Sequence, residues 1–217
     1  MSWIEKTIVA LDNMSLDHAE EIIAEHGANV HGFKMNHTIY PYLDKSGLNI
    51  FADYKLYDIP NTVCSVVEHL IGTGASMVTI NVMNDRETLW ELKKYSTKIK
   101  LLGISVLTSW TASDCDEILR RSIEDVFERN VELMENFGFW GMICAVPDLK
   151  YKVVSDTKLK KVCPGIRMKL KSETGYLKYD DQQRTASPDE AVNEGADYIV
   201  MGRSFFEYVD QYNNNKL

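Results

Sequence analysis

The ionisable residues best placed for chemistry lie in the segment 51–62, which reads FADYKLYDIPNT. Asp53 and Lys55 are two positions apart, and side chains with that spacing point to the same side of a strand. Pro60 biases Ile59 away from a helical conformation, which places Asp58 in a loop just after the strand. Carboxylates near an ammonium group keep it protonated, and the ammonium keeps them ionised. The segment therefore predicts a cluster of groups that hold one another in their charged forms.

A purely structural ladder of ion pairs is the alternative interpretation of these charges. Desolvating a buried ion pair costs free energy, so such pairs are poor devices for stabilising a fold. A functional site is therefore the interpretation that we favour.

Eight short apolar runs, rich in valine and isoleucine, supply the strands that such a site needs. They are Thr7–Leu11, Val30–Phe33, Ile50–Ala52, Met77–Val82, Leu101–Leu107, Gly141–Val146, Val162–Cys163 and Tyr198–Met201. Short continuous apolar runs that alternate with helical patterns are typical of parallel strands buried on both faces. Polar residues stand at the carboxyl ends of five runs, at Asp12, Lys34, Asp53, Thr108 and Arg203. Barrel enzymes assemble their active sites on that face.

The number and spacing of these runs predict the fold. Eight strand–helix units in 217 residues average about 27 residues each, which is near the lower size limit of a (β/α)8 barrel. An open, doubly wound α/β sheet is the alternative fold. No linker rich in proline, glycine or serine interrupts the chain. We therefore expect an α/β protein with a single TIM-barrel domain over residues 1–217.

The composition limits the classes of partner. The chain carries 24 lysines and arginines against 32 aspartates and glutamates, a net charge of −8. Nucleic-acid and anionic-membrane binders need an excess of positive charge, so neither partner is expected, whereas a few local cations can still hold a small phosphorylated ligand. The four cysteines include no CxxC pair and indicate buried thiols. Without a secretory signal or an apolar run long enough to span a bilayer, we expect a cytoplasmic location.

The segment 53–62 closely resembles the D-x-K-x-x-D-I-P-N-T signature of the orotidine 5′-phosphate decarboxylase family. Other motifs of that family occur in the expected order, at Val9–Asp12, Lys34, Val106–Ser109, Pro164–Arg167, Asp181–Gln182 and Gly202–Ser204. The segment from Arg167 to Gln182 resembles the family's lid and is longer than the common bacterial form. The resemblance extends over nearly the whole chain.

This resemblance implies a (β/α)8 barrel that converts orotidine 5′-monophosphate (OMP) to UMP and CO2 in de novo pyrimidine biosynthesis. It implies no metal ion and no organic cofactor, so catalysis would rest on electrostatics. Lys55 would stabilise the C6 carbanion and protonate it, with Asp53 near the departing carboxylate. Lys34 and Asp12 would orient the ribose. The family works as a homodimer in which the aspartate matching Asp58 reaches into the partner's active site.

The resemblance also assigns the residues that bind the rest of the substrate. Arg167 and Arg203, with the backbone N–H at Gly202, would clamp the phosphate, since guanidinium groups bind phosphate in a bidentate way. Gln182 would bridge the phosphate and the base. The remaining substrate contacts implied by the family motifs are Ile59, Pro60, Asn61 and Thr62 after the third strand, and Thr108 and Ser109 after the fifth.

Two other functions remain open at this point. One is a sugar-phosphate decarboxylase or hexulose-phosphate synthase of the same superfamily, which uses Mg²⁺. Those relatives typically carry a glutamate where this chain has Lys34, and an ammonium there would repel the metal. The other is a non-catalytic nucleotide-binding descendant, against which the joint presence of Lys34, Asp53, Lys55 and Asp58 weighs.

Overall fold

The computed structural model of the chain describes residues 2–41, 47–168 and 184–214, with side chains through Val209. Its eight strands are all parallel and close into a barrel in the order β1 to β8. They are β1 Thr7–Ala10, β2 Gly32–Met35, β3 Ile50–Leu56, β4 Met77–Asn81, β5 Lys100–Ile104, β6 Gly141–Ile143, β7 Lys160–Cys163 and β8 Tyr198–Met201. The predicted (β/α)8 barrel is confirmed, and the open sheet was the wrong alternative.

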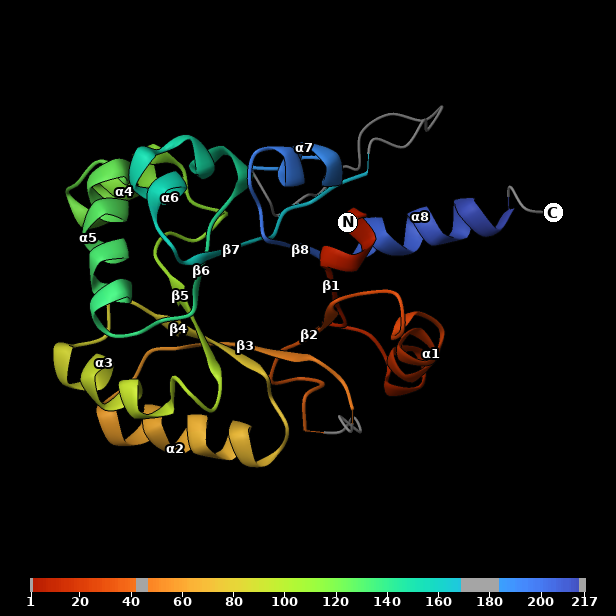
Figure 1. Ribbon diagram of the computed structural model, residues 1–217, viewed down its shortest axis with the longest axis horizontal. Coiled ribbons are helices and arrows are strands. Elements are labelled where there is room, and N and C mark those ends of the chain that lie inside the picture. Colours follow the sequence, from red (N-terminus) through yellow and green to blue (C-terminus); the bar gives the residue numbers. More distant parts are fainter. Residues whose placement is uncertain (1, 42–46, 169–183, 215–217) are drawn as a thin grey trace.

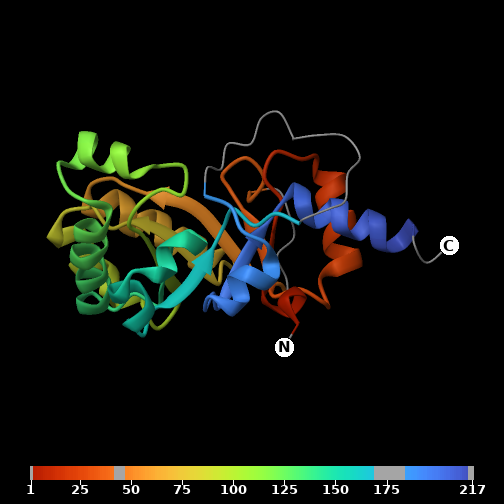
Figure 2. The ribbon, with the colours of Figure 1, turned by 90° about the horizontal axis from the view of Figure 1, so that it is seen from above.

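Helices surround the barrel and follow the strands along the chain (Figures 1 and 2). They are α1 Leu16–His26, α2 Pro60–Gly72, α3 Arg86–Leu92, α4 Ala112–Leu119, α5 Ile123–Asn136, α6 Lys152–Asp156, α7 Pro188–Asn193 and α8 Arg203–Asn214, with 3₁₀ turns at Trp3–Lys6, Lys93–Tyr95 and Val146–Lys150. Ser15 caps α1 by accepting the His18 N–H. Pro60 opens α2, where its fixed φ suits the first helical position.

The apolar runs form two packed layers. Inside the barrel, strand residues from opposite sides meet in a small cluster of Ile8, Phe51, Met77, Leu102, Val162 and Val200. A larger cluster fills the space between the strands and the surrounding helices. All four cysteines are buried free thiols, as expected. Across the residues that the structure describes, none of the helices has the length and apolar character to cross a membrane.

Several strand boundaries differ from the predicted ones. The fifth strand ends at Ile104 instead of Leu107. The sixth strand ends at Ile143 instead of Val146, because Pro147 lacks a backbone N–H and its neighbours form a 3₁₀ turn. The second strand begins at Gly32 instead of Val30. The most consequential difference is β3, which continues beyond the predicted end at Ala52 as far as Leu56.

β3 contains a bulge, after which it pairs with β4 again at Leu56. Ala52 pairs with Val78 of β4 and Leu56 with Ile80, so the three residues 53–55 lie opposite the single residue Thr79. Lys55 within this bulge has a φ of 50°, in the left-handed region that residues with a Cβ seldom adopt. The simple alternation of a regular strand is therefore the wrong account of how Asp53 and Lys55 come together.

Candidate active site

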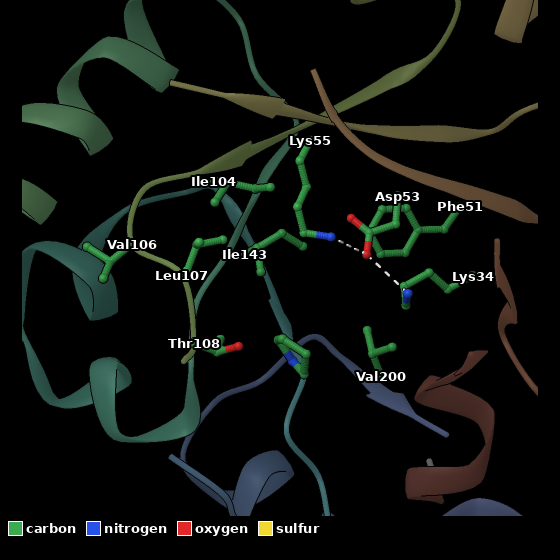
Figure 3. A pocket seen from close by; sticks show the side chains of 11 residues that line it. Lys34, Phe51, Asp53, Lys55, Ile104, Val106, Leu107, Thr108, Ile143 and Val200 are labelled. Carbon is green, nitrogen blue, oxygen red and sulfur yellow. Dashed lines mark hydrogen bonds and ion pairs between the residues drawn. The ribbon is translucent and has the colours of Figure 1, made fainter. Parts of the chain in front are cut away.

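A cavity of about 220 Å³ opens at the carboxyl end of the barrel strands (Figure 3). Its walls combine two charged pairs with apolar side chains, from Lys34, Phe51, Asp53, Lys55, Ile104, Val106, Leu107, Thr108, Ile143, Pro164 and Val200. A second, more open hollow of about 560 Å³ shares Lys34, Pro164 and Val200 with it. We call them the inner and the outer hollow.

Four charged side chains of alternating sign form one continuous row, which runs from Asp12 in the outer hollow to Lys55 in the inner hollow. The Lys34 ammonium pairs with Asp12 and lies 3.1 Å from Asp53 Oδ2, and the Lys55 Nζ lies 2.8 Å from the same oxygen. Figure 3 shows both lysines converging on Asp53. The side chains of Lys34 and Asp53 are only 12% exposed, whereas that of Lys55 is 50% exposed. The more accessible of the two ammonium groups in the inner hollow is therefore that of Lys55.

The row fixes the charge of its buried members. Burial by itself would raise the pKa of Asp53, but the ammonium groups of Lys34 and Lys55 outweigh it and hold that pKa below its ordinary value. Burial would likewise lower the pKa of Lys34, and the carboxylates of Asp53 and Asp12 outweigh it and raise that pKa. Both groups are therefore ionised at neutral pH.

Acidic pH should lower the free energy of unfolding because Asp53 becomes protonated. Because its folded pKa lies below the ordinary value of 3.8, the stability that it contributes is fully present above about pH 4 and is lost as the pH falls through the folded pKa. Urea unfolding of wild type and Asp53→Asn from pH 7 to pH 2.5 measures this contribution. The difference in unfolding free energy should change only at the acid end, and a constant difference down to pH 2.5 would contradict the assignment.

Two buried polar residues of the β4 region, which the sequence patterns did not single out, hold the segment that carries Lys55. The Thr79 hydroxyl accepts the Lys55 backbone N–H at 2.8 Å and donates to Asp53 Oδ1 at 3.0 Å. The Asn84 amide donates to the Leu56 carbonyl at 2.9 Å and accepts the Asp58 N–H at 3.2 Å. Both lie in or just after an apolar strand, where the sequence gives no sign of these partners.

The signature residues after Lys55 lie outside the two hollows. Asp58 is exposed, and its carboxylate accepts the Ile59 N–H at 2.7 Å. Among the described residues, neither hollow is lined by any of Asp58, Ile59, Pro60, Asn61 and Thr62. Within this chain the fold thus brings Asp12, Lys34, Asp53 and Lys55 together and leaves Asp58, the other acid of the motif, at the surface.

The loop after β5 reaches the inner hollow through Thr108, while Ser109 is exposed and lies outside its lining. Arg184 anchors this loop, because its guanidinium donates to the carbonyl of Leu107 at 3.0 Å and to that of Thr108 at 3.4 Å. The same guanidinium pairs with the buried Asp148. Arg184 is another functional candidate that sequence reasoning missed, although it stands only two positions after Gln182.

The outer hollow carries the cations expected for an anionic group. Arg167, Gly202 and Arg203 line it together with Asp12 and Lys34. Arg203 is also the first residue of α8, so this helix begins at the lining of the outer hollow. Asp181 and Gln182, with the rest of the predicted lid between residues 169 and 183, lie outside the described residues.

Comparison with known protein families identifies the family of this barrel. The model of the orotidine 5′-phosphate decarboxylase / HUMPS family matches residues 5–211 of the chain. The chain belongs to this family. The resemblance inferred from the motifs is therefore confirmed.

Curated orotidine 5′-phosphate decarboxylases are about one third identical to this chain over the aligned residues. Orotidine 5′-phosphate decarboxylase of Wolbachia pipientis subsp. Culex pipiens is 37% identical over 169 residues, which cover 75% of this chain and 71% of that protein. The decarboxylase of Dictyoglomus thermophilum is 33% identical over 243 residues, covering 98% and 93%. The crystal structure of the Lactobacillus acidophilus enzyme has a TM-score of 0.73 at 23% identity, covering 92% and 90%, and supports the fold.

Proposed function

We propose that this family member is an orotidine 5′-phosphate decarboxylase, which converts OMP to UMP and CO2 in de novo pyrimidine biosynthesis. The observation that carries this proposal is the row from Asp12 through Lys34 and Asp53 to Lys55, which ends in a half-exposed ammonium inside an otherwise largely apolar cavity. The curated relatives that bear the decarboxylase name support the same activity.

The two hollows suit the two ends of the substrate. The inner hollow, with apolar walls and Thr108, would take the pyrimidine, and the outer hollow, with Arg167 and Arg203, would take the phosphate. Lys34 borders both, so its ammonium and the adjacent Asp12 would contact the ribose between them. The phosphate takes no part in bond breaking, but its binding energy can fix the pyrimidine against Lys55.

In the proposed reaction the bond between C6 and the carboxylate breaks, its electron pair stays on C6, and CO2 leaves. The Lys55 ammonium would stabilise the negative charge that develops on C6, because a fixed cation in a cavity with little water stabilises charge more strongly than bulk solvent does. Lys55 would then donate a proton to C6 and regain one from water. Asp53 would lie beside the departing carboxylate. The scheme needs neither a metal ion nor an organic cofactor.

Lys34 also argues against the metal-dependent alternative within the family. Its ammonium stands between the carboxylates of Asp12 and Asp53, in the space where a divalent cation would have to bind them. A cation at that point repels a second one. The buried, fully paired charges weigh equally against an idle nucleotide-binding descendant, since an unused site gains nothing from desolvating them.

We also propose that the chain forms one domain, works in the cytoplasm and acts as a homodimer that shares Asp58 between subunits. Asp58 is exposed beside Tyr57 and Ile59, two large apolar side chains that are each 65% exposed. Exposed apolar side chains that flank a charged residue are suited to an interface with another protein surface. A second subunit on this face would bring Asp58, and with it Asn61 and Thr62, toward a neighbouring active site.

The purified protein should decarboxylate OMP in buffer that contains EDTA and no added metal. The reaction removes the carboxylate conjugated to the pyrimidine, so the ultraviolet absorbance of the orotate chromophore should fall with time. Hexulose-phosphate formation from formaldehyde and ribulose 5-phosphate, with and without Mg²⁺, provides the matched assay for the alternative. Constant absorbance with folded protein would sink the proposal, as would activity in the second assay alone.

A further inference from the structure

Thr79 of β4 is the single residue that faces the bulge of β3. Three residues of β3, from Asp53 to Lys55, fit between the backbone partners of Val78 and Ile80, so the regular ladder is interrupted there. Thr79 is fully buried, and its hydroxyl bonds the first and the last residue of the bulge, through the Asp53 carboxylate and the Lys55 backbone N–H. A side chain thus replaces the missing backbone contact at the residue proposed to carry the reaction.

We propose that Thr79 is a positioning residue for Lys55 and Asp53. A threonine hydroxyl has one hydrogen to donate and lone pairs to accept with. The Lys55 N–H, at 2.8 Å, uses a lone pair, so the hydrogen is free for Asp53 Oδ1 at 3.0 Å. One oxygen of the carboxylate is then held by Thr79, while the other receives both lysine ammonium groups. The hydroxyl therefore orients the carboxylate that in turn holds the Lys55 side chain.

The backbone of Lys55 needs such support more than an ordinary strand residue does. Its φ of 50° is left-handed, and a residue with a Cβ keeps that conformation only where its surroundings enforce it. Thr79 holds the Lys55 N–H, and Asn84 holds the Leu56 carbonyl immediately after it. The two side chains from the β4 region thus secure the chain at and just beyond the strained residue.

Loss of the Thr79 hydroxyl should reduce catalysis, because the proposed reaction depends on the position of the Lys55 ammonium. Displacement of a reacting group by about 1 Å can reduce a rate by on the order of 100-fold. Removing the Thr79 hydroxyl frees Asp53 to rotate and leaves the Lys55 N–H without its partner. Substrate binding would rely on Arg167, Arg203 and Lys34, and Lys34 keeps its ion pair with Asp12 when Asp53 rotates. The loss should therefore fall on kcat and spare KM.

Three variants test this role, which rests on the proposed decarboxylase activity. Thr79→Val keeps the size and branching and removes only the hydroxyl; we expect kcat to fall about 10- to 100-fold with KM within about threefold of wild type. Thr79→Ser, which restores the hydroxyl, should recover kcat to within about threefold. Thr7→Val is the matched control: Thr7 is also a fully buried strand threonine, bonded at 3.0 Å to the Trp3 carbonyl at the opposite end of the barrel, and its loss should leave kcat unchanged.

Backbone hydrogen exchange of the Lys55 amide, followed by NMR, gives a readout that does not need activity. Thr79→Val should accelerate that exchange, and Thr79→Ser should protect it again. If wild type fails to decarboxylate OMP, the proposed function is wrong, and this exchange experiment still decides the positioning role. A Thr79→Val enzyme with unchanged kcat or unchanged Lys55 exchange would overturn the inference, as would a Thr79→Ser enzyme as impaired as the valine variant. Should the valine variant fail to fold, Thr79→Ala takes its place.

Discussion

Replacing Lys55 by alanine is expected to reduce kcat by on the order of 10⁴-fold or more while the protein stays folded. The proposed site uses this one ammonium both to stabilise the carbanion and to supply the proton, so both contributions disappear together. A 10⁴-fold loss corresponds to about 5.5 kcal/mol of transition-state stabilisation. Lys34 cannot take over, because its ammonium is held between Asp12 and Asp53.

The fold should tolerate this change because the Lys55 side chain is half exposed and contacts the charged row only through Asp53. Alanine keeps a Cβ, so the strained φ is neither relieved nor worsened. Stopped-flow or long-time absorbance assays measure kcat, and calorimetric titration with UMP tests whether the binding site survives.

Lys160→Ala provides the matched control for Lys55→Ala. Lys160 is 47% exposed and pairs with Asp197 at 2.8 Å, the same distance as between Lys55 and Asp53, but it lies at the start of β7, at the opposite end of the barrel. Removing it should leave kcat unchanged. Substantial turnover by Lys55→Ala, or an equal loss in Lys160→Ala, would show that the proton donor has been misassigned.

The fold was predictable because its strands are buried on both faces. Such strands appear in the sequence as continuous apolar runs, and each of the eight runs corresponds to one strand of the barrel. Their ends were less predictable, since an apolar run can continue past the last ladder bond. Val146 is buried like a strand residue, yet Pro147 after it lacks the N–H that a ladder needs, and the chain turns there.

The charged residues of the site were predictable because they stand at or just after the ends of apolar runs in the sequence. Asp12, Lys34, Asp53 and Lys55 are charged residues at strand ends, and the barrel brings such ends together regardless of the local details. The residues that hold them were not predictable in the same way. Thr79 lies within a run of apolar residues, and its function comes from a bulge in the neighbouring strand, which no pattern within β4 encodes.

Replacing Asp58 by alanine should also abolish most of the activity if a neighbouring subunit's site depends on it. Within one protomer Asp58 is exposed and lines neither hollow among the described residues, so a loss of kcat in Asp58→Ala would point to a second subunit. Size-exclusion chromatography with light scattering gives the oligomeric state of wild type and variant. A fully active Asp58→Ala enzyme would contradict the shared site.

Mixing inactive Asp58→Ala and Lys55→Ala dimers distinguishes a shared site from a site within one subunit. After random exchange about half of the dimers are mixed, and in each mixed dimer one site combines an intact Lys55 with an intact Asp58 from the other subunit. The second site of that dimer carries both substitutions, so recovery should approach about one quarter of wild-type activity. If Asp58 served its own subunit, every site would lack one group or the other and mixing would restore nothing. Exchange is verified by native mass spectrometry of tagged subunits, and absent recovery despite exchange would refute the role of Asp58 across the interface.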